Sequence, residues 1–180
     1  MTYEEKTMKS EKIYEGKVLN LRLDTVELPD KKYTKREIVE HPGAVAIIPI
    51  TEEGEIILVK QFRKAIEDES LEIPAGSLEK GEDPTRCAIR ELKEETGVTA
   101  SEVKFLLEFY TSPGYSNEKM HLFLARKLKK GVAEPENDEY IDIVKMKLED
   151  LMEKINNGEI ADSKTIIGLL KLKEILKEEL

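Results

Sequence analysis

The sequence is poor in cysteine and in long apolar runs, and its basic residues are outnumbered by acidic ones. Its 180 residues include one cysteine, Cys87, which excludes a disulfide framework and a thiolate metal cluster and fits a reducing compartment. No stretch approaches the ~20 consecutive apolar residues that a membrane-spanning helix needs. Residues 1–16 contain no apolar run, so we expect no secretory signal and a cytoplasmic location.

The charge balance is acidic, with 38 acidic against 29 basic residues and a formal net charge of −9. Such a chain is a poor candidate for non-specific nucleic-acid binding, because the phosphate backbone would repel it. An anionic small molecule can still bind where metal cations or local arginines reverse the field at one site. We therefore expect no nucleic acid and no membrane among the partners.

The N-terminal segment alternates apolar and polar residues as β-strands do. Leucines occupy every second position from Leu19 to Leu23, and Pro29-Asp30 interrupts the pattern. Residues 1–42 are therefore predicted to form a small antiparallel sheet of about three strands. With so few apolar side chains this sheet cannot bury a core alone, so it should pack on the rest of the chain or on a second copy.

The remainder of the chain, residues 43–180, mixes strand and helix patterns. Residues 44–50 are almost wholly apolar, as in a central strand buried on both faces, and residues 56–62 are predicted to return beside them as a hairpin. This mixture indicates an α/β protein with a mixed sheet between helices. Further strand patterns occur at 103–110, 120–128 and 140–147, and later helices are expected from Leu148 and from a cap at Asp162 or Ser163.

A helix is predicted over residues 84–96. Asp83 suits the N-cap, Pro84 suits the first helical position, and Gly97 stands just past the expected end. Ala88, Ile89 and Leu92 form an apolar stripe that would hold this helix to the sheet.

Three carboxylates share one face of the predicted helix, because Glu94 and Glu95 follow Glu91 by three and four residues. Neighbouring carboxylates repel each other, so a cation should lie among them. Oxygen ligands without histidine favour Mg²⁺ or Mn²⁺ over zinc. A carboxylate-held divalent cation beside a glycine loop suits a diphosphate. The alternative is a solvated helix face, on which Arg90 is merely the i,i+4 partner of Glu94.

Residues 76–98 resemble the signature box of the Nudix hydrolases, with every fixed position filled. The resemblance implies an α/β/α sandwich with a mixed sheet over 43–180, preceded by the small N-terminal antiparallel sheet over 1–42. The matching positions are Gly76, Glu82, Arg90, Glu91, Leu92, Glu94, Glu95, Gly97 and Val98.

The resemblance also implies roles for the box residues. Glu91 and Glu95 would ligate metal together with the backbone carbonyl of Ala75, while Glu94 lies close by and Arg90 orients the glutamates. Two or three Mg²⁺ ions are implied for each active site, with Mn²⁺ as a substitute. Gly76, Glu82 and Gly97 would have structural roles in the motif.

The loop Ser112–Glu118 resembles the SPG-containing loop of the ADP-ribose pyrophosphatases, a Nudix subfamily, and segments along the rest of the chain resemble them too. In this subfamily the water-activating carboxylate usually lies on a late loop. Here the following strand favours Glu139 as the base, with Glu94 as the fallback. The same loop also contains Glu134, Glu136 and Asp138.

The subfamily resemblance implies the substrate contacts and the assembly. Arg63 should contact the diphosphate or terminal ribose, and Glu118 the terminal ribose. Arg36 matches an arginine that reaches the ligand from the partner subunit, which implies a homodimer packed through the N-terminal sheets. Pro113 and Gly114 complete the substrate-binding set.

The expected reaction is the Mg²⁺-dependent hydrolysis of ADP-ribose to AMP and ribose 5-phosphate, by attack of water on the pyrophosphate. One alternative is a pyrophosphatase for another nucleotide sugar, such as GDP-mannose or ADP-glucose. Another is a non-catalytic domain that senses ADP-ribose. Loss of box glutamates would favour the sensor, and this chain retains them all.

Overall fold

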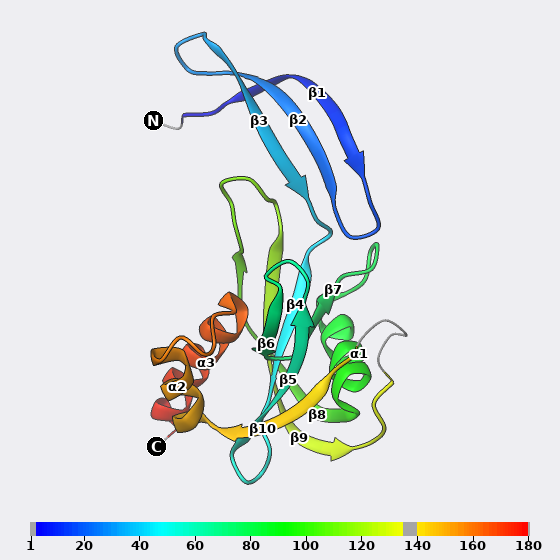
Figure 1. The fold of residues 1–180 in the computed structure, drawn as a ribbon, viewed down its shortest axis with the longest axis vertical. Helices are drawn as coiled ribbons and strands as arrows, with labels where there is room; N and C mark the ends of the chain where they lie inside the picture. The colour runs from blue at the N-terminus through cyan, green and yellow to red at the C-terminus, as the bar shows by residue number, and fades with distance from the viewer. Residues whose placement is uncertain (1–2, 135–139, 180) are drawn as a thin grey trace. The chain divides into compact units, whose positions relative to one another are not determined.

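The computed structural model describes residues 3–134 and 140–179, which divide into two compact units (Figure 1). The first unit contains Met1–Gly43 and Phe109–Lys119. The second contains Ala44–Glu108 and Met120–Leu180. No helix among the described residues is both long enough and apolar enough to cross a membrane.

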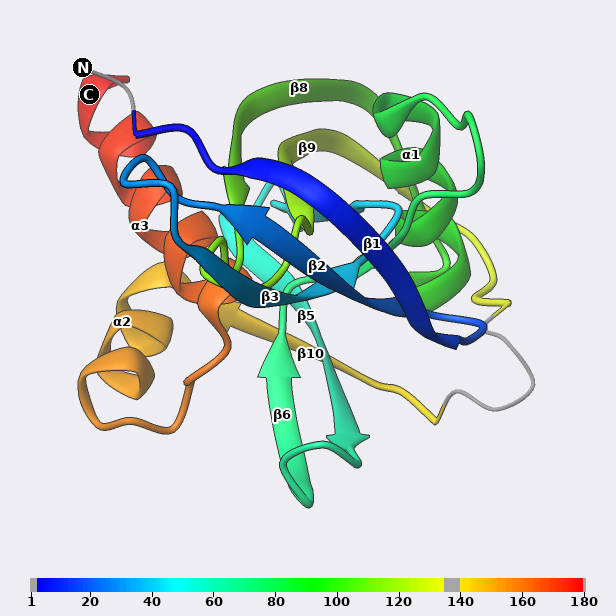
Figure 2. The same ribbon diagram turned by 90° about the horizontal axis from the view of Figure 1, so that it is seen from above.

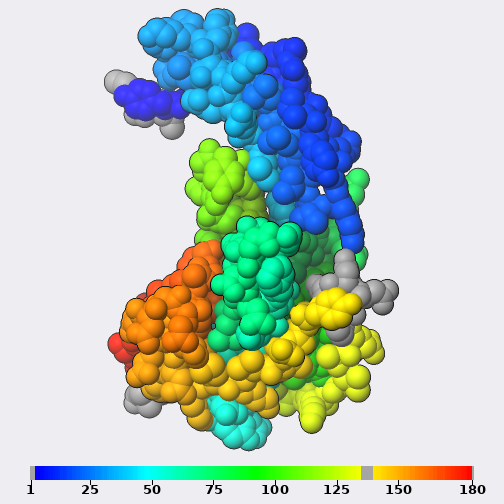
Figure 3. Space-filling view, viewed as in Figure 1, coloured from blue at the N-terminus to red at the C-terminus, as the bar shows by residue number. Residues whose placement is uncertain are grey.

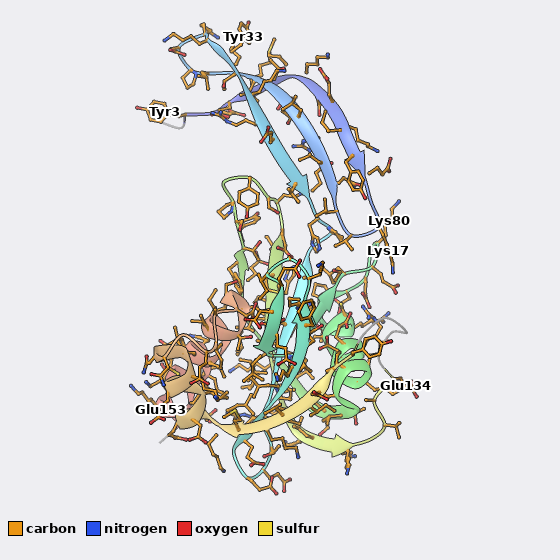
Figure 4. All side chains as sticks on the ribbon, in the orientation of Figure 1. Tyr3, Lys17, Tyr33, Lys80, Glu134 and Glu153 are labelled. Atoms are coloured by element: carbon orange, nitrogen blue, oxygen red, sulfur yellow. The ribbon has the colours of Figure 1, made fainter. Side chains whose placement is uncertain are left out.

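The first unit contains the small antiparallel sheet that the sequence predicts. Its strands are β1 (Lys6–Glu15), β2 (Asn20–Glu27) and β3 (Tyr33–Glu40), with β2 in the middle. All ten residues of β1 are exposed, so neither face of this edge strand is covered. Figure 4 labels Tyr33, which begins β3 at the tip of the β2–β3 hairpin.

The segment Phe109–Lys119 belongs to the same unit and runs alongside the end of β3. The N–H of Val39 donates to the carbonyl of Tyr115 at 2.8 Å, and the N–H of Asn117 donates to the carbonyl of Val39 at 3.2 Å. The Asn117 side chain accepts from the His41 N–H at 2.8 Å. These bonds fix the loop that contains the Ser-Pro-Gly sequence.

The described part of the second unit contains two sheets. A mixed sheet has the order β7 (Ala75–Ser77), β4 (Ala44–Pro49), β9 (Lys119–Lys130), β8 (Val98–Tyr110). In it β4 runs parallel to β9 and antiparallel to β7. An antiparallel sheet has the order β10 (Asp142–Lys147), β5 (Glu55–Arg63), β6 (Asp68–Glu72).

Strand β4 is buried at every residue, as the apolar run predicts. The predicted hairpin with residues 56–62 is wrong, because β5 belongs to the other sheet and meets the β4 end only at the isolated bridge Ile50–Ile56. The N–H of Ile50 donates instead to the carbonyl of Ala125 in β9 at 3.0 Å. The later part of the chain thus occupies the edge of β4 that the hairpin needed.

Within the described residues of the second unit, three helices flank the strands. Figures 1 and 2 show α1 (Pro84–Thr96) on one side and α2 (Leu148–Asn156) with α3 (Ser163–Glu178) on the other. The predicted α/β/α sandwich with a mixed sheet is therefore confirmed. Figure 3 shows α2 (orange) at the surface next to β10 (gold).

The start and end of α1 agree with the sequence prediction. The Asp83 side chain accepts from the N–H groups of Thr85 and Arg86, both at 3.1 Å. Gly97 adopts the left-handed conformation, with φ of 67°, that ends a helix in this way. The sequence left the N-cap of α3 open between Asp162 and Ser163. The structure has Asp162 as the N-cap, and its side chain accepts from the Thr165 N–H at 3.0 Å.

Candidate active site

Helix α1 presents its acidic face because its apolar side is buried in the core. Cys87, Ala88 and Leu92 are fully buried, and they pack with residues of β4 and β9. The predicted stripe is correct for Ala88 and Leu92, whereas Ile89 is 40% exposed. With this side anchored, Glu91 and Glu94 face away from the core, since residues one helical turn apart share a face.

Strand β7 places backbone groups beside these carboxylates. The Ala75 N–H donates to Glu95 Oε2 at 3.0 Å, and Glu95 is 4% exposed. A Cβ added at Gly76 would lie 2.0 Å from the carboxyl carbon of Glu91, so the glycine makes room for that carboxylate. The structure thus brings Ala75, Gly76, Glu91 and Glu95 together.

Arg90 gathers three of the box carboxylates. Its Nη1 donates to Glu91 at 2.7 Å and to Glu94 at 2.9 Å, and its Nε donates to Glu82 at 3.0 Å. These bonds, first of all that with Glu82, raise the pKa of Arg90. The hydrogen bond from Arg90 lowers the pKa of Glu82 to about 2, with a further contribution from the Glu79 N–H. Glu82 therefore joins the loop after β7 to α1.

The chemistry of this donor set fits a divalent cation. Glu82, Glu91, Glu94 and Glu95 bring four negative charges, against one positive charge from Arg90. Carboxylate and carbonyl oxygens are the ligands that Mg²⁺ and Mn²⁺ prefer. Among the residues that the structure describes, no three acidic, histidine or cysteine side chains already converge on a common point.

The segment after β9 is fixed to the end of α1. The Gly131 N–H donates to the carbonyl of Gly97 at 2.7 Å, and the Glu134 N–H donates to the carbonyl of Glu94 at 3.0 Å. Figure 4 labels Glu134, which lies beside α1. Glu139, the base implied by the resemblance, lies outside the described residues, as do Glu136 and Asp138.

Arg63 belongs to a second charged cluster in the same unit. Its Nε and Nη2 donate to the two oxygens of Glu72 at 2.8 and 2.6 Å, and the Lys164 ammonium also binds Glu72. The hydrogen bond that Arg63 donates to Glu72 raises the pKa of Arg63, with smaller contributions from the charges of Glu95 and Asp162. Burial alone would raise the pKa of Glu72, but Arg63 and Lys164 lower it to about 2.

The remaining candidate substrate contacts lie in the first unit. Arg36 is bound to Glu5 through two hydrogen bonds, of 3.0 and 2.6 Å. Glu118 accepts from the Thr111 hydroxyl at 2.7 Å, and its other oxygen lies 3.6 Å from Nδ1 of His41. Pro113 and Gly114 lie in the loop between β8 and β9, which runs beside the end of β3.

The sequence reasoning missed Glu72, Lys164 and Thr165. A signal for Lys164 was present, because it precedes Gly168 and Leu172 by one and two helical turns and so shares their buried face. A lysine on the buried face of a helix indicates a buried partner of opposite charge. For Glu72 no such signal exists, since its cations come from other elements.

Models of two families match consecutive parts of the chain. The NUDIX domain matches residues 40–166, and the nucleoside diphosphate sugar hydrolase N-terminal domain matches residues 5–39.

Two bacterial relatives match nearly the whole chain. An ADP-ribose pyrophosphatase of Bacillus subtilis is 48% identical over 180 residues, covering 98% of this chain and 97% of its own. A methanol dehydrogenase activator of Bacillus methanolicus is 47% identical over 181 residues, covering 98% of both chains. A crystal structure of an ADP compounds hydrolase superposes with a TM-score of 0.88 at 23% identity, covering 99% and 98% of the two chains, and supports the fold.

Proposed function

The chain belongs to the Nudix family, and we propose that it hydrolyses ADP-ribose to AMP and ribose 5-phosphate in a reaction that requires Mg²⁺. The observation that carries this proposal is the close approach of β7 to the acidic face of α1, where Gly76 makes room for Glu91. The similarity to a B. subtilis ADP-ribose pyrophosphatase over nearly the whole chain supports this substrate.

The proposed metal ligands are Glu91, Glu95 and the backbone carbonyl of Ala75. We propose that each active site binds two or three Mg²⁺ ions, which Mn²⁺ can replace. Such ions neutralise a diphosphate and lower the pKa of bound water. Arg90 keeps the carboxylates together through its bonds to Glu91 and Glu94. Its single positive charge leaves the group strongly anionic, so an anionic substrate needs these cations in order to bind.

We propose that Glu139 takes a proton from the attacking water. The water oxygen then forms a bond to one phosphorus, and the bond from that phosphorus to the bridging oxygen breaks. Glu94 is the alternative base, and its side chain is 36% exposed and bound to Arg90. A partly exposed carboxylate can accept a proton from a water molecule that reaches it.

The substrate contacts are part of the proposal. Arg63 is assigned to the diphosphate or terminal ribose, because its side chain is 42% exposed while Glu72 holds one edge of the guanidinium. Glu118 is assigned to the terminal ribose, within the loop that contains Pro113 and Gly114. A carboxylate held by Thr111 can accept hydrogen bonds from sugar hydroxyls.

We further propose a cytoplasmic homodimer that packs through the N-terminal sheets. Strand β1 is an exposed edge strand in which Met8, Ile13 and Tyr14 are each 50% exposed or more. Exposed apolar side chains on an unpaired edge favour association with another sheet. In that dimer Arg36 would contact substrate bound by the partner subunit. Sedimentation should give twice the chain mass of 20.6 kDa, and a monomer at micromolar concentration would contradict the dimer.

The test of the reaction is product analysis on the purified protein. We expect ADP-ribose with Mg²⁺ to give AMP and ribose 5-phosphate, with turnover lost on addition of EDTA and restored by Mg²⁺ or Mn²⁺. Glu95→Gln should abolish turnover while the protein stays folded. Turnover of GDP-mannose or ADP-glucose in place of ADP-ribose would overturn the substrate, and binding of ADP-ribose without turnover would indicate a sensor.

A further inference from the structure

A short segment of the second unit, Glu72–Ala75, links the start of α3 to the box carboxylates. At one end the Glu72 carboxylate binds Lys164, and the next N–H, that of Ile73, donates to Thr165 Oγ1 at 2.9 Å. At the other end the Ala75 N–H donates to Glu95. Between them the carbonyl of Pro74 accepts from the Ile47 N–H at 2.9 Å. The segment is therefore held by a bond at every residue.

Lys164 is the unusual member of this arrangement. Its side chain is only 11% exposed, and its ammonium binds Glu72 and, at 3.0 Å, Oδ1 of Asp162. Asp162 is itself fixed, because its other oxygen accepts from the N–H of Thr165 at 3.0 Å and from the hydroxyl at 2.6 Å. Burying a charged pair seldom stabilises a fold more than apolar packing does. Stability alone therefore does not account for a lysine at this position.

The charge balance of the cluster gives Lys164 a role. Glu72 and Asp162 bring two negative charges, which Arg63 and Lys164 balance. Without Lys164 the cluster would have a net charge of −1, and Arg63 would be the sole cation for a buried carboxylate. An arginine in that position is less able to bind an anion, because its charge is already neutralised.

We infer that Lys164 is a positioning residue for substrate binding, which shares Glu72 with Arg63 and so keeps the Arg63 guanidinium in place and its charge available for the diphosphate. This inference rests on the proposed function, in which Arg63 contacts the substrate. It also assigns a function to the first turn of α3, an element that lies outside the Nudix signature box.

The test is a double-mutant cycle on ADP-ribose hydrolysis. K164M keeps the length of the side chain and removes its charge, and we expect it to raise KM at least about tenfold with kcat changed less than about threefold. K164R should recover most of the loss, since it restores the charge. In the R63Q background, K164M should leave KM unchanged, because the residue through which it acts is gone.

K171M is the matched control. Lys171 lies on the same helix and its ion pair with Glu174, at 2.6 Å, is on the surface, so the substitution is the same but only an exposed pair is lost. We expect its KM and its melting temperature to match those of wild type. A K164M protein that melts earlier but keeps the wild-type KM would show a purely structural lysine and overturn the inference. An equal KM increase in the wild-type and R63Q backgrounds would also overturn it.

If K164M does not fold, E72Q decides instead. This variant removes the anchor of Arg63 while making the cluster more positive, so a positioning role predicts a higher KM and a pure charge effect predicts a lower one. A wild-type KM in R63Q would refute the contact of Arg63 with substrate and the inference with it. If wild type hydrolyses no nucleotide sugar, the proposed function fails, but the inference can still be tested. The same double-mutant cycle is then measured on the dissociation constant of ADP-ribose, determined by calorimetry.

Discussion

The carboxylate of Glu91 lies where the Cβ of any residue larger than glycine at position 76 would fall, 2.0 Å from its carboxyl carbon. Two consecutive elements, β7 and α1, thus meet at a contact that only a missing side chain allows. The atoms that would clash belong to the end of a flexible side chain. The protein can therefore fold with a larger residue at position 76, but only by moving a proposed metal ligand.

We accordingly predict that Gly76→Ala reduces kcat/KM for ADP-ribose at least about a hundredfold, because Glu91 is displaced from the metal site. The melting temperature should fall by only a few degrees. Ser77→Ala is the control, since the Ser77 side chain in the same strand is exposed, and it should behave as wild type. Full activity in Gly76→Ala would show that Glu91 is not needed where the structure places it.

A side chain at position 97 would clash with backbone atoms, whereas one at position 76 would clash with a flexible side chain. An added Cβ would lie 2.4 Å from the Ala133 nitrogen, and the φ of +67° disfavours any side chain. We predict that Gly97→Ala costs about 2 kcal/mol or more in the free energy of unfolding and also lowers kcat, since the displaced segment leads to Glu139.

Gly158→Ala isolates the backbone component of that effect. Gly158 has a similar φ of +77°, but nothing lies within 4 Å of the position of an added Cβ. We expect Gly158→Ala to cost about 1 kcal/mol and to leave kcat unchanged. Urea denaturation and steady-state kinetics measure both quantities, and equal effects of the two substitutions would contradict the role given to the segment after β9.

The pKa of Glu72 predicts how stability depends on pH. Burial raises this pKa, but Arg63 and Lys164 bring it from 4.5 to about 2 in the folded protein. Between these values the unfolded chain binds more protons, so the free energy of unfolding falls as pH drops from about 4.5 to about 2. The contribution that is lost amounts to about 3 kcal/mol.

Glu72→Gln should therefore be less stable than wild type at pH 7, and the difference should shrink as pH falls through that range. Melting temperatures of the two proteins between pH 7 and pH 2 measure it. Glu149→Gln, on the exposed first turn of α2, should follow the wild-type curve throughout. A constant difference between Glu72→Gln and wild type at all pH values would refute the assignment.

Cys87 should be chemically inert while the protein is folded. The residue is fully buried, and burial, together with a hydrogen bond to Glu82, raises its pKa to about 12. A thiol at such a pKa is not the nucleophilic thiolate at pH 8. We predict that Cys87 does not react with a disulfide reagent under native conditions. In guanidinium, one thiol per chain should react. Rapid labelling of the native protein would contradict the packing beneath α1.

Much of the fold follows from local patterns in the sequence. Asp83, Pro84 and Gly97 mark α1 to the residue, because caps act through the backbone of their own helix. The hairpin between 44–50 and 56–62 was predicted wrongly, because pairing depends on which distant strand competes for the edge. Here β9 occupies the edge of β4, and a local pattern contains no information about it.

The candidate site likewise has one part that local sequence patterns predict and another that depends on how distant elements pack. Periodicity within one helix places Glu91, Glu94 and Glu95 on one face without reference to the rest of the chain. The partnership of Glu72 with Lys164 joins residues 92 positions apart, and it becomes visible only when β6 and α3 pack. The inward-facing lysine was the available signal, but the sequence does not identify its partner.

The parallel pairing of β4 with β9 also determines when the site can form during synthesis. Ala44 pairs with Met120, and α1 lies between them in the sequence. Phe123 and Ala125 of β9 complete the core beneath α1, so the helix lacks part of its support until β9 has left the ribosome. Contacts between such distant segments form late because closing the chain between them costs entropy. A nascent chain that already contains the entire signature box therefore lacks the fixed carboxylate face, and we expect the proposed metal site to form only in the completed domain.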